Sequence, residues 1–349
     1  MSRALRSAGL FDLQVNGFAG IDFNAETIDA DQLDHALEAM LATGVTSCLP
    51  TLITAPADVL ANRFAALDRA VARSRLGLIM VLGYHLEGPF LNPAQGYAGC
   101  HPPDAMRPTD GSLVERWTRG LARPILLVTV APEGPGGQAF VKEMNAAGRV
   151  VAIGHSAADF GVVAGAAEAG ARLSTHLGNG LPQVLPKLDN ALFAQLAEDR
   201  LHASFIADGI HLPPPALKAM LRAKGLDRSI LVTDAVSAAG TAPGVYPFAG
   251  MSVEHAEDGS VRLPGSRLLA GSALTLDRAV RNLVEWGIAT PEEALRLASD
   301  NPRRLMGPAL DAFSVRSEAG EVDWSPGLAV REVRLGERQW RFPNGGVLA

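Results

Sequence analysis

Glutamate and histidine side chains stand where several apolar segments end, and their types suit a divalent metal. Glu87, His155 and His176 each follow a different predicted strand. Catalytic Zn²⁺ usually takes three protein ligands, drawn from histidine nitrogen and carboxylate oxygen, and leaves a fourth position for water. One such histidine alone is more often a hydrogen-bonded structural residue, and Glu87 alone could cap the turn that follows it. Together the three residues favour a metal site.

Asp234 directly follows the apolar segment Ile230–Thr233, so it should emerge at the same face of the fold. A carboxylate in that position can act as a general base that takes a proton from the attacking water and returns it to the leaving group. The alternative is that Asp234 caps the next segment. We favour the catalytic role.

Other polar side chains are candidates for lining the site. Gln14 and Asn16 alternate along the first strand, so both point the same way. Amides are poor Zn²⁺ ligands beside imidazole and carboxylate, so they should line the site without completing a second metal centre; a structural role at the rim is the alternative. His101 and His211 lie in loops rich in proline and glycine and could contact a substrate. Cys100, beside His101, is interpreted as a packed thiol.

These residues need a scaffold, and the chain offers a regular one. Apolar and β-branched runs alternate with Ala- and Leu-rich segments of helical spacing. Eight strands are predicted, at Leu10–Val15, Val45–Ile53, Leu78–His85, Ile125–Val130, Val150–Ile153, Arg172–Thr175, Ala203–Ala207 and Ile230–Thr233. Helices are predicted at Asp31–Thr43, Ala57–Ser74, Gln138–Ala147, Ala157–Ala169, Ala191–Glu198, Pro215–Lys224 and Leu274–Trp286.

Strands that are apolar on both faces and alternate with helices predict an α/β fold. Eight such units favour a closed (β/α)8 barrel of the TIM type, and an open doubly wound sheet is the alternative. Six strands run into polar clusters, which in a barrel all fall at the C-terminal mouth, where barrel enzymes place their chemistry. We predict the barrel over residues 10–307 and a small, reduced β appendage from residues 1–9 and 308–349, formed mainly by the C-terminal tail.

Composition excludes several kinds of partner. The 31 Lys and Arg against 37 Asp and Glu give a net charge of −6 without a basic run, so neither nucleic acid nor an acidic membrane is expected. No segment approaches the ~20 apolar residues of a membrane helix, and no signal peptide is visible. Two cysteines are too few for a disulfide scaffold. We therefore predict a cytoplasmic protein.

The ordered set of motifs resembles the N-acetylglucosamine-6-phosphate deacetylases of the amidohydrolase superfamily. The resemblance runs from Leu10 to Gly307. Its carriers, in chain order, are Phe11–Gly17, His85–Pro93, Gly154–Ser156, Thr175–Asn179, Asp208–His211, Thr233–Ala235, Leu269–Ser272, Ala279–Asn282 and Asn301-Pro302. Each motif alone is weak, whereas the set in this order is specific.

The resemblance implies roles for individual residues. It implies one divalent metal, with Zn²⁺ ahead of Fe²⁺ or another ion, held by Glu87, His155 and His176. It implies that Asp234 is the general acid and base, and that carbonyl or sugar contacts come from His101, Asn179, Gly180 and His211. Many superfamily members carry His-x-His on the first strand for a second metal. Gln14 and Asn16 stand there instead, as in other members of this family, which implies a single-metal site.

Two departures from the family pattern bear on substrate and assembly. Lys187 stands where the family has an arginine that helps to bind the substrate phosphate, so the resemblance implies that Lys187 contacts the substrate. Lysine is a single mobile charge rather than a planar fork, so bidentate phosphate capture by Lys187 is not expected, and a non-phosphorylated substrate stays open. The N-terminal strands of the family's accessory β domain are missing, which weakens inferences about the appendage and about a homodimer that depends on it.

The sequence therefore predicts a metal-dependent amide hydrolase. Its substrate would be a small N-acetylated amino sugar, N-acetylglucosamine 6-phosphate or a related N-acetylhexosamine, and its product acetate. One rival is an amidohydrolase that acts on another N-acyl or cyclic amide. The other is a non-catalytic ligand-binding protein on the same scaffold, against which the intact set of Glu87, His155, His176 and Asp234 argues.

Overall fold

A ring of eight parallel strands forms the centre of the molecule in a computed structural model, which describes residues 5–342. The strands are β2 (Leu10–Val15), β5 (Val45–Ile53), β6 (Tyr84–Glu87), β7 (Ile125–Val130), β8 (Val150–Ile153), β9 (Ala171–Ser174), β10 (His202–Ile206) and β11 (Ser229–Val232). Backbone hydrogen bonds close the seam between β11 and β2, from Asp234 N to Gln14 O (2.9 Å) and from Asn16 N to Ala235 O (2.6 Å). The predicted closed barrel is confirmed.

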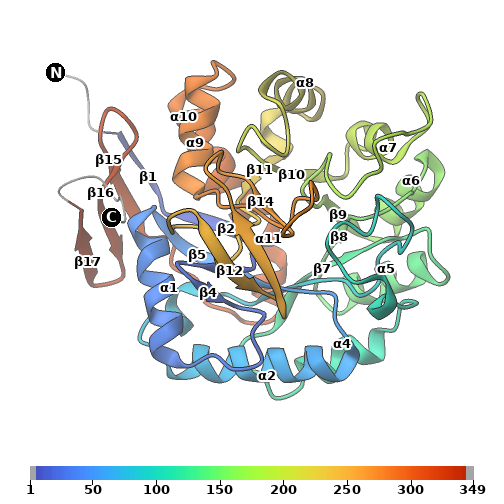
Figure 1. Cartoon of the computed structure of the whole chain (residues 1–349), viewed down its shortest axis with the longest axis horizontal. Helices are drawn as coiled ribbons and strands as arrows, with labels where there is room; N and C mark the ends of the chain where they lie inside the picture. Colours follow the sequence, from blue (N-terminus) through green and yellow to red (C-terminus); the bar gives the residue numbers. More distant parts are fainter. Residues whose placement is uncertain (1–4, 343–349) are drawn as a thin grey trace.

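Helices cover the outside of this barrel (Figure 1). They are α1 (Ala30–Ala42), α2 (Ala57–Arg73), α4 (Gly111–Thr118), α5 (Gly137–Ala146), α6 (Phe160–Ala169), α7 (Ala191–Ala197), α8 (Pro214–Lys224), α9 (Leu276–Glu285), α10 (Pro291–Ala298) and α11 (Asp300–Ala312). Three short turns are α3 (Gly77–Met80), η1 (Pro103–Ala105) and η2 (Leu226–Arg228). Over residues 5–342, no helix combines the length and the apolar character needed to cross a bilayer.

The predicted strand at Leu78–His85 is wrong in its first half. That part forms the helical turn α3, and β6 begins only at Tyr84. The Ser74 side chain accepts hydrogen bonds from the backbone N–H of Leu76 (3.1 Å) and of Gly77 (2.7 Å), which is the way a serine starts a helical turn. A short apolar run cannot be assigned to strand or buried helix from its periodicity alone.

The two ends of the described chain meet in one antiparallel sheet beside the barrel. It consists of β1 (Leu5–Ala8), β15 (Glu321–Trp324), β16 (Val330–Leu335) and β17 (Arg338–Arg341), in that order. Its inner face is buried, and the Trp324 side chain, 1% exposed, packs against Gly44. A Cβ atom at Gly44 would lie only 2.9 Å from the indole ring. The predicted boundary at residues 307 and 308 falls inside α11, and residues 1–4 and 343–349 of the predicted appendage lie outside the described part.

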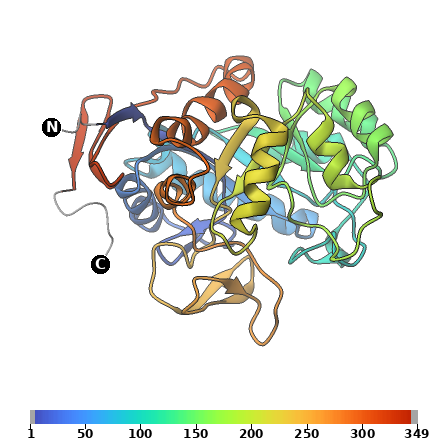
Figure 2. The same cartoon turned by 90° about the horizontal axis from the view of Figure 1, so that it is seen from above.

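An insertion between β11 and α9 builds one wall of the barrel mouth and was not predicted. It contains the antiparallel strands β12 (Gly244–Phe248), β13 (Met251–His255) and β14 (Val261–Arg262), which project from the barrel in Figure 2. The chain then returns to the barrel, where Ser272 N donates to Asp234 O (2.9 Å) and Val236 N donates to Ser272 O (3.0 Å). A further two-stranded ribbon, β3 (Gly17–Phe18) with β4 (Ile21–Asp22), follows β2.

Candidate active site

Three buried side chains converge at the C-terminal mouth of the barrel. Glu87 is the last residue of β6, and His155 and His176 each lie two residues beyond β8 and β9. His176 Nε2 is 2.8 Å from Glu87 Oε1, His155 Nε2 is 3.6 Å from the same oxygen, and the two Nε2 atoms are 3.2 Å apart. The barrel thus brings together the residues that the sequence proposed as metal ligands, from three strands far apart in the chain.

Left-handed backbone turns the side chains of this site inward. His155 (φ 50°), His176 (φ 28°) and Asp234 (φ 50°) all have positive φ, which residues with a Cβ adopt rarely and at an energetic cost. Each of them lies two residues beyond the end of a parallel strand. The shared conformation at three strand ends marks a place where the surrounding structure holds the chain in an unfavourable geometry, as functional sites often do.

The ring orientation of His155 leaves a lone pair facing the cluster. Its Nδ1 lies 2.7 Å from the Tyr97 carbonyl oxygen, which can only accept, so Nδ1 carries the proton and Nε2 is free to act as a ligand. Burial lowers the pKa of His176, but the hydrogen bond and charge of Glu87 outweigh it and raise the pKa above its usual value. The hydrogen bond to Glu87 therefore favours a proton on His176 Nε2.

The trio fits a divalent metal in its separations and its donors. Zn–N and Zn–O distances of about 2.0–2.2 Å at a tetrahedral angle place two ligand atoms roughly 3.3–3.5 Å apart. The separations of His155 Nε2 from His176 Nε2 (3.2 Å) and from Glu87 Oε1 (3.6 Å) are close to that range, whereas His176 Nε2 and Glu87 Oε1, at 2.8 Å, are at hydrogen-bond distance. Within the described residues, Glu87, His155 and His176 form the one such cluster of three His, Cys, Asp or Glu. A bound cation would take the place of the hydrogen-bonded proton on His176 Nε2.

Asp234 lies beside Glu87 and is held by two amides. Its Oδ1 accepts from Asn16 Nδ2 (2.8 Å) and from Gln14 Nε2 (3.1 Å), and Gln14 Nε2 also donates to Glu87 Oε1 (3.0 Å). Burial, followed by the negative charge of Glu87, raises the pKa of Asp234 to about 6. Gln14 thus bridges two carboxylates that would otherwise repel each other at close range.

A cavity of about 340 Å³ opens above the cluster. That volume lies in the range of about 300–1,000 Å³ typical of small-molecule sites. The predicted contact residues His101, Asn179, Gly180 and His211 all line it, with Glu87, His155, His176 and Asp234. A side chain at Gly180 would lie 2.7 Å from His155 Nδ1, so the chain needs glycine there. Lys187 is exposed and is not among the lining residues.

The two lining histidines differ in their surroundings. His101 is buried, its Nδ1 lies 2.9 Å from Thr54 Oγ1, and its Nε2 lies 3.8 Å from Glu87 Oε2. Burial, followed by the charge of His155, lowers the pKa of His101 to about 3, so the ring is neutral at pH 7. His211 Nδ1 pairs with Asp208 Oδ2 at 2.6 Å, which fixes that ring by a carboxylate.

Sequence reasoning missed three contributors to this site. Tyr97 acts through its backbone carbonyl, so its residue type gave no signal. Gln183 and Arg267 line the cavity from loops. The motif at Leu269–Ser272 lies next to the loop that carries Arg267. The backbone pairing of this motif with Asp234, however, is seen only in the folded chain.

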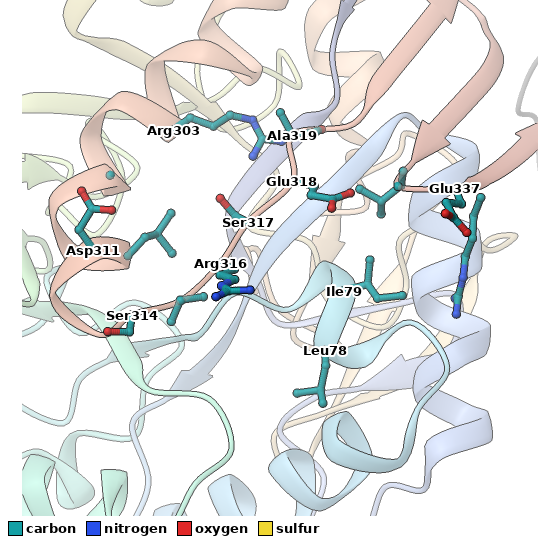
Figure 3. A pocket seen from close by; sticks show the side chains of 16 residues that line it. Leu78, Ile79, Arg303, Asp311, Ser314, Arg316, Ser317, Glu318, Ala319 and Glu337 are labelled. Carbon is teal, nitrogen blue, oxygen red and sulfur yellow. Dashed lines mark hydrogen bonds between the residues drawn. The ribbon is translucent and has the colours of Figure 1, made fainter.

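A second cavity, of about 1140 Å³, lies between α3, α11 and the β appendage (Figure 3). None of the predicted site residues lines it. One of its three arginines, Arg303, donates to the backbone oxygens of Gly9 (2.9 Å) and Ala319 (3.2 Å), so it ties the appendage to the barrel. The chemistry therefore belongs to the smaller cavity at the mouth.

Relatives of known activity align over most of the chain. An N-acetylgalactosamine-6-phosphate deacetylase of Escherichia coli O157:H7 is 33% identical over 326 residues, 92% of this chain and 84% of that protein. An N-acetylglucosamine-6-phosphate deacetylase of Bacillus subtilis is 32% identical over 305 residues, 86% of this chain and 74% of that protein. No protein-family model matches the chain.

Solved structures agree with the sequence relatives. An N-acetyl-D-glucosamine-6-phosphate deacetylase mutant of Mycobacterium smegmatis, in complex with N-acetyl-D-glucosamine-6-phosphate, superposes with a TM-score of 0.83 at 29% identity, over 96% of this chain and 86% of that one. The deacetylase of Pasteurella multocida gives a TM-score of 0.84 at 27% identity, over 97% of this chain and 87% of that one. The similarity thus extends from the barrel to the segments around it.

Proposed function

Because the chain belongs to the N-acetylglucosamine-6-phosphate deacetylase family, we propose that Glu87, His155, His176 and Asp234 remove the acetyl group from an N-acetylated amino sugar phosphate. The enzyme hydrolyses an amide bond and releases acetate and a free amine. Family membership confirms the resemblance found in the motifs. The rival activities, on another N-acyl or cyclic amide or as a non-catalytic binder, have no observation in their favour.

Glu87, His155 and His176 would hold one divalent metal, for which zinc is our proposal. Such an ion polarises the amide carbonyl and lowers the pKa of water to about 7. The chain's own contribution begins with orientation. Tyr97 fixes the His155 ring through its carbonyl, and Gln14 fixes the Glu87 carboxylate.

Asp234 would move the proton of the reaction. Its Oδ1 is occupied by Gln14 and Asn16, so Oδ2 is the atom free to accept a proton from the attacking water. A carboxylate pKa of about 6 suits a group that takes a proton near neutral pH and then gives it to the amine nitrogen as the amide breaks. The cavity admits substrate on that side of the carboxylate, since Asp234 lines it.

His101 and His211 would position the substrate. A neutral His101 can donate one N–H to the carbonyl oxygen, where negative charge develops, and such donors typically contribute about 10²-fold in rate. His211, held by Asp208, offers its other ring nitrogen to a sugar hydroxyl. Asn179 and Gly180 line the same cavity, where they can contact the sugar.

The convergence of Glu87, His155, His176 and Asp234 on one cavity carries this proposal. The test is acetate release by the purified protein from N-acetylglucosamine 6-phosphate and N-acetylgalactosamine 6-phosphate, with metal content measured in the same sample. We expect turnover with one bound divalent ion per chain, and the ratio of the two rates identifies the preferred epimer. Absence of acetate release from both sugars by metal-loaded protein would refute the proposal. A cytoplasmic location and a homodimer stay predictions, which fractionation and light scattering can check.

A further inference from the structure

We propose that Arg267 is the residue that binds the phosphate of the substrate, the role that the family pattern gives to the position of Lys187. This inference rests on the proposed function, because it concerns the same cavity and the same class of substrate. It assigns recognition of the phosphate to the insertion after β11 instead of the loop at residues 178–190.

The lining of the cavity singles out Arg267. Among the lining residues in the described range 5–342, it is the one lysine or arginine. Lys187 and Arg267 are both exposed, and Lys187 lies outside the lining. Over the same described range, the Arg267 guanidinium has neither a hydrogen bond nor an ion pair with protein groups, whereas Arg262 on the same insertion is paired with Asp258 (3.0 Å). The Arg267 donors are therefore available to a ligand.

The charges within the cavity call for a cation away from its floor. Glu87 and Asp234 lie together at the floor, where the acetyl group must react. A phosphate monoester carries roughly −1.5 to −2 charges near pH 7, so it needs a cationic partner of its own at its end of the cavity. An arginine fork can bind two phosphate oxygens at once, which a lysine cannot do. Gln183, which lines the same cavity, adds neutral amide donors.

The backbone ties Arg267 to the catalytic floor. Arg267 lies in a hairpin turn in which Leu263 N donates to Leu268 O (3.1 Å), and the chain then pairs with the residues after β11. Ser272 N donates to Asp234 O (2.9 Å), so only a few residues separate Arg267 from a direct hydrogen bond to the Asp234 backbone. This connection attaches the segment that carries Arg267 to the strand end that carries Asp234, so both residues face one cavity.

The test compares Arg267→Gln with the matched control Lys187→Gln, on N-acetylglucosamine with and without the 6-phosphate. We expect R267Q to raise KM for the phosphorylated sugar about 10- to 100-fold, as a lost charge-assisted contact does, with a much smaller change in kcat. The reaction with the non-phosphorylated sugar should change less than about threefold, because that sugar makes no phosphate contact. Arg267→Lys should recover part of the loss, and K187Q should behave as the wild type.

A binding measurement separates failure of this inference from failure of the proposed function. Calorimetry with glucosamine 6-phosphate, the expected product, needs no turnover. We expect the wild type and K187Q to bind it and R267Q to bind it at least about tenfold more weakly. A wild type that binds the sugar phosphate through Arg267 but releases no acetate would overturn the function and keep the inference. Loss of binding in K187Q but not in R267Q, or equal losses with both sugars in R267Q, would overturn the inference.

Discussion

Replacing Asp234 by asparagine should abolish turnover while making the metal-free protein more stable at neutral pH. Asparagine has the same shape, tolerates the left-handed backbone (φ 50°), and can still accept from Gln14 and Asn16 at its oxygen. It cannot take a proton from water. Since general acid and base catalysis each contribute about 10²–10⁴-fold, the loss in kcat should be about 10³-fold or more.

The gain in stability follows from the carboxylate pair at the cavity floor. The pKa of Asp234 rises from 3.8 to about 6, through burial first and then the charge of Glu87. Each unit corresponds to about 1.4 kcal/mol, so ionised Asp234 destabilises the fold by at most about 3 kcal/mol. The real value is smaller, because one side of the carboxylate reaches solvent through the cavity.

The stability difference between D234N and the wild type should depend on pH in a defined direction. The raised pKa means that the folded state binds the proton more tightly than the unfolded state, so the cost is fully present above pH 6 and disappears below about pH 4. Metal-free D234N should therefore melt at a higher temperature than metal-free wild type at pH 7.5 and at the same temperature near pH 4. With metal bound, the difference should shrink, because the cation attracts both carboxylates.

The assay combines acetate release, metal content and melting curves of matched samples. Asp189→Asn, the same chemical change at an exposed position of the rim, is the control and should alter none of the three. A D234N enzyme that keeps kcat within tenfold of the wild type would reject the proton-transfer role. A metal-free D234N that melts lower than the wild type at pH 7.5 would reject the electrostatic reasoning.

Three further outcomes are expected. Chelation of the metal should stop acetate release and lower the melting temperature, and added Zn²⁺ should restore both; unchanged melting would contradict a site that links three strands. Burial raises the pKa of Asp12 to about 7, so the Asp12 carboxyl should contribute a loss of at most about 4 kcal/mol in stability between pH 4 and 7, and a pH series of melting curves should show that Asp12→Asn removes this contribution relative to the wild type. Trp324→Ala should cost about 3–5 kcal/mol in urea unfolding monitored on the whole chain, because the indole is buried against Gly44; a barrel that unfolds at its wild-type midpoint would show that the appendage is independent.

The barrel could be predicted because its signals are local. Strands such as β2, β5 and β7 are buried throughout and end at the residues that the pattern predicted. The insertion β12–β14 escaped prediction for the opposite reason. Its strands are short, and exposed residues alternate along them with partly buried ones. They are ordered by pairing with one another and with the chain after β11.

The floor of the site was also within reach of the sequence, and its walls were only partly so. Side chains that end parallel strands must meet at one mouth, so Glu87, His155, His176 and Asp234 could be grouped without coordinates. The wall residues stand on loops whose course no periodicity describes. Lys187 occupies the aligned position but lies outside the lining, whereas Arg267, two residues before the Leu269–Ser272 motif, lines the cavity.

Gln14 connects the barrel's closure to its chemistry. Its backbone oxygen accepts from Asp234 N across the β2–β11 seam, and its side-chain amide donates to both Asp234 and Glu87. Two adjacent carboxylates require positive charge or donated protons between them. A second cation would supply the charge, as the His-x-His of many superfamily members implies, and here amide protons lie in that place instead. The Gln14 amide therefore supplies a donated proton between the two carboxylates, and Gln14→His should change the proton affinity of Asp234.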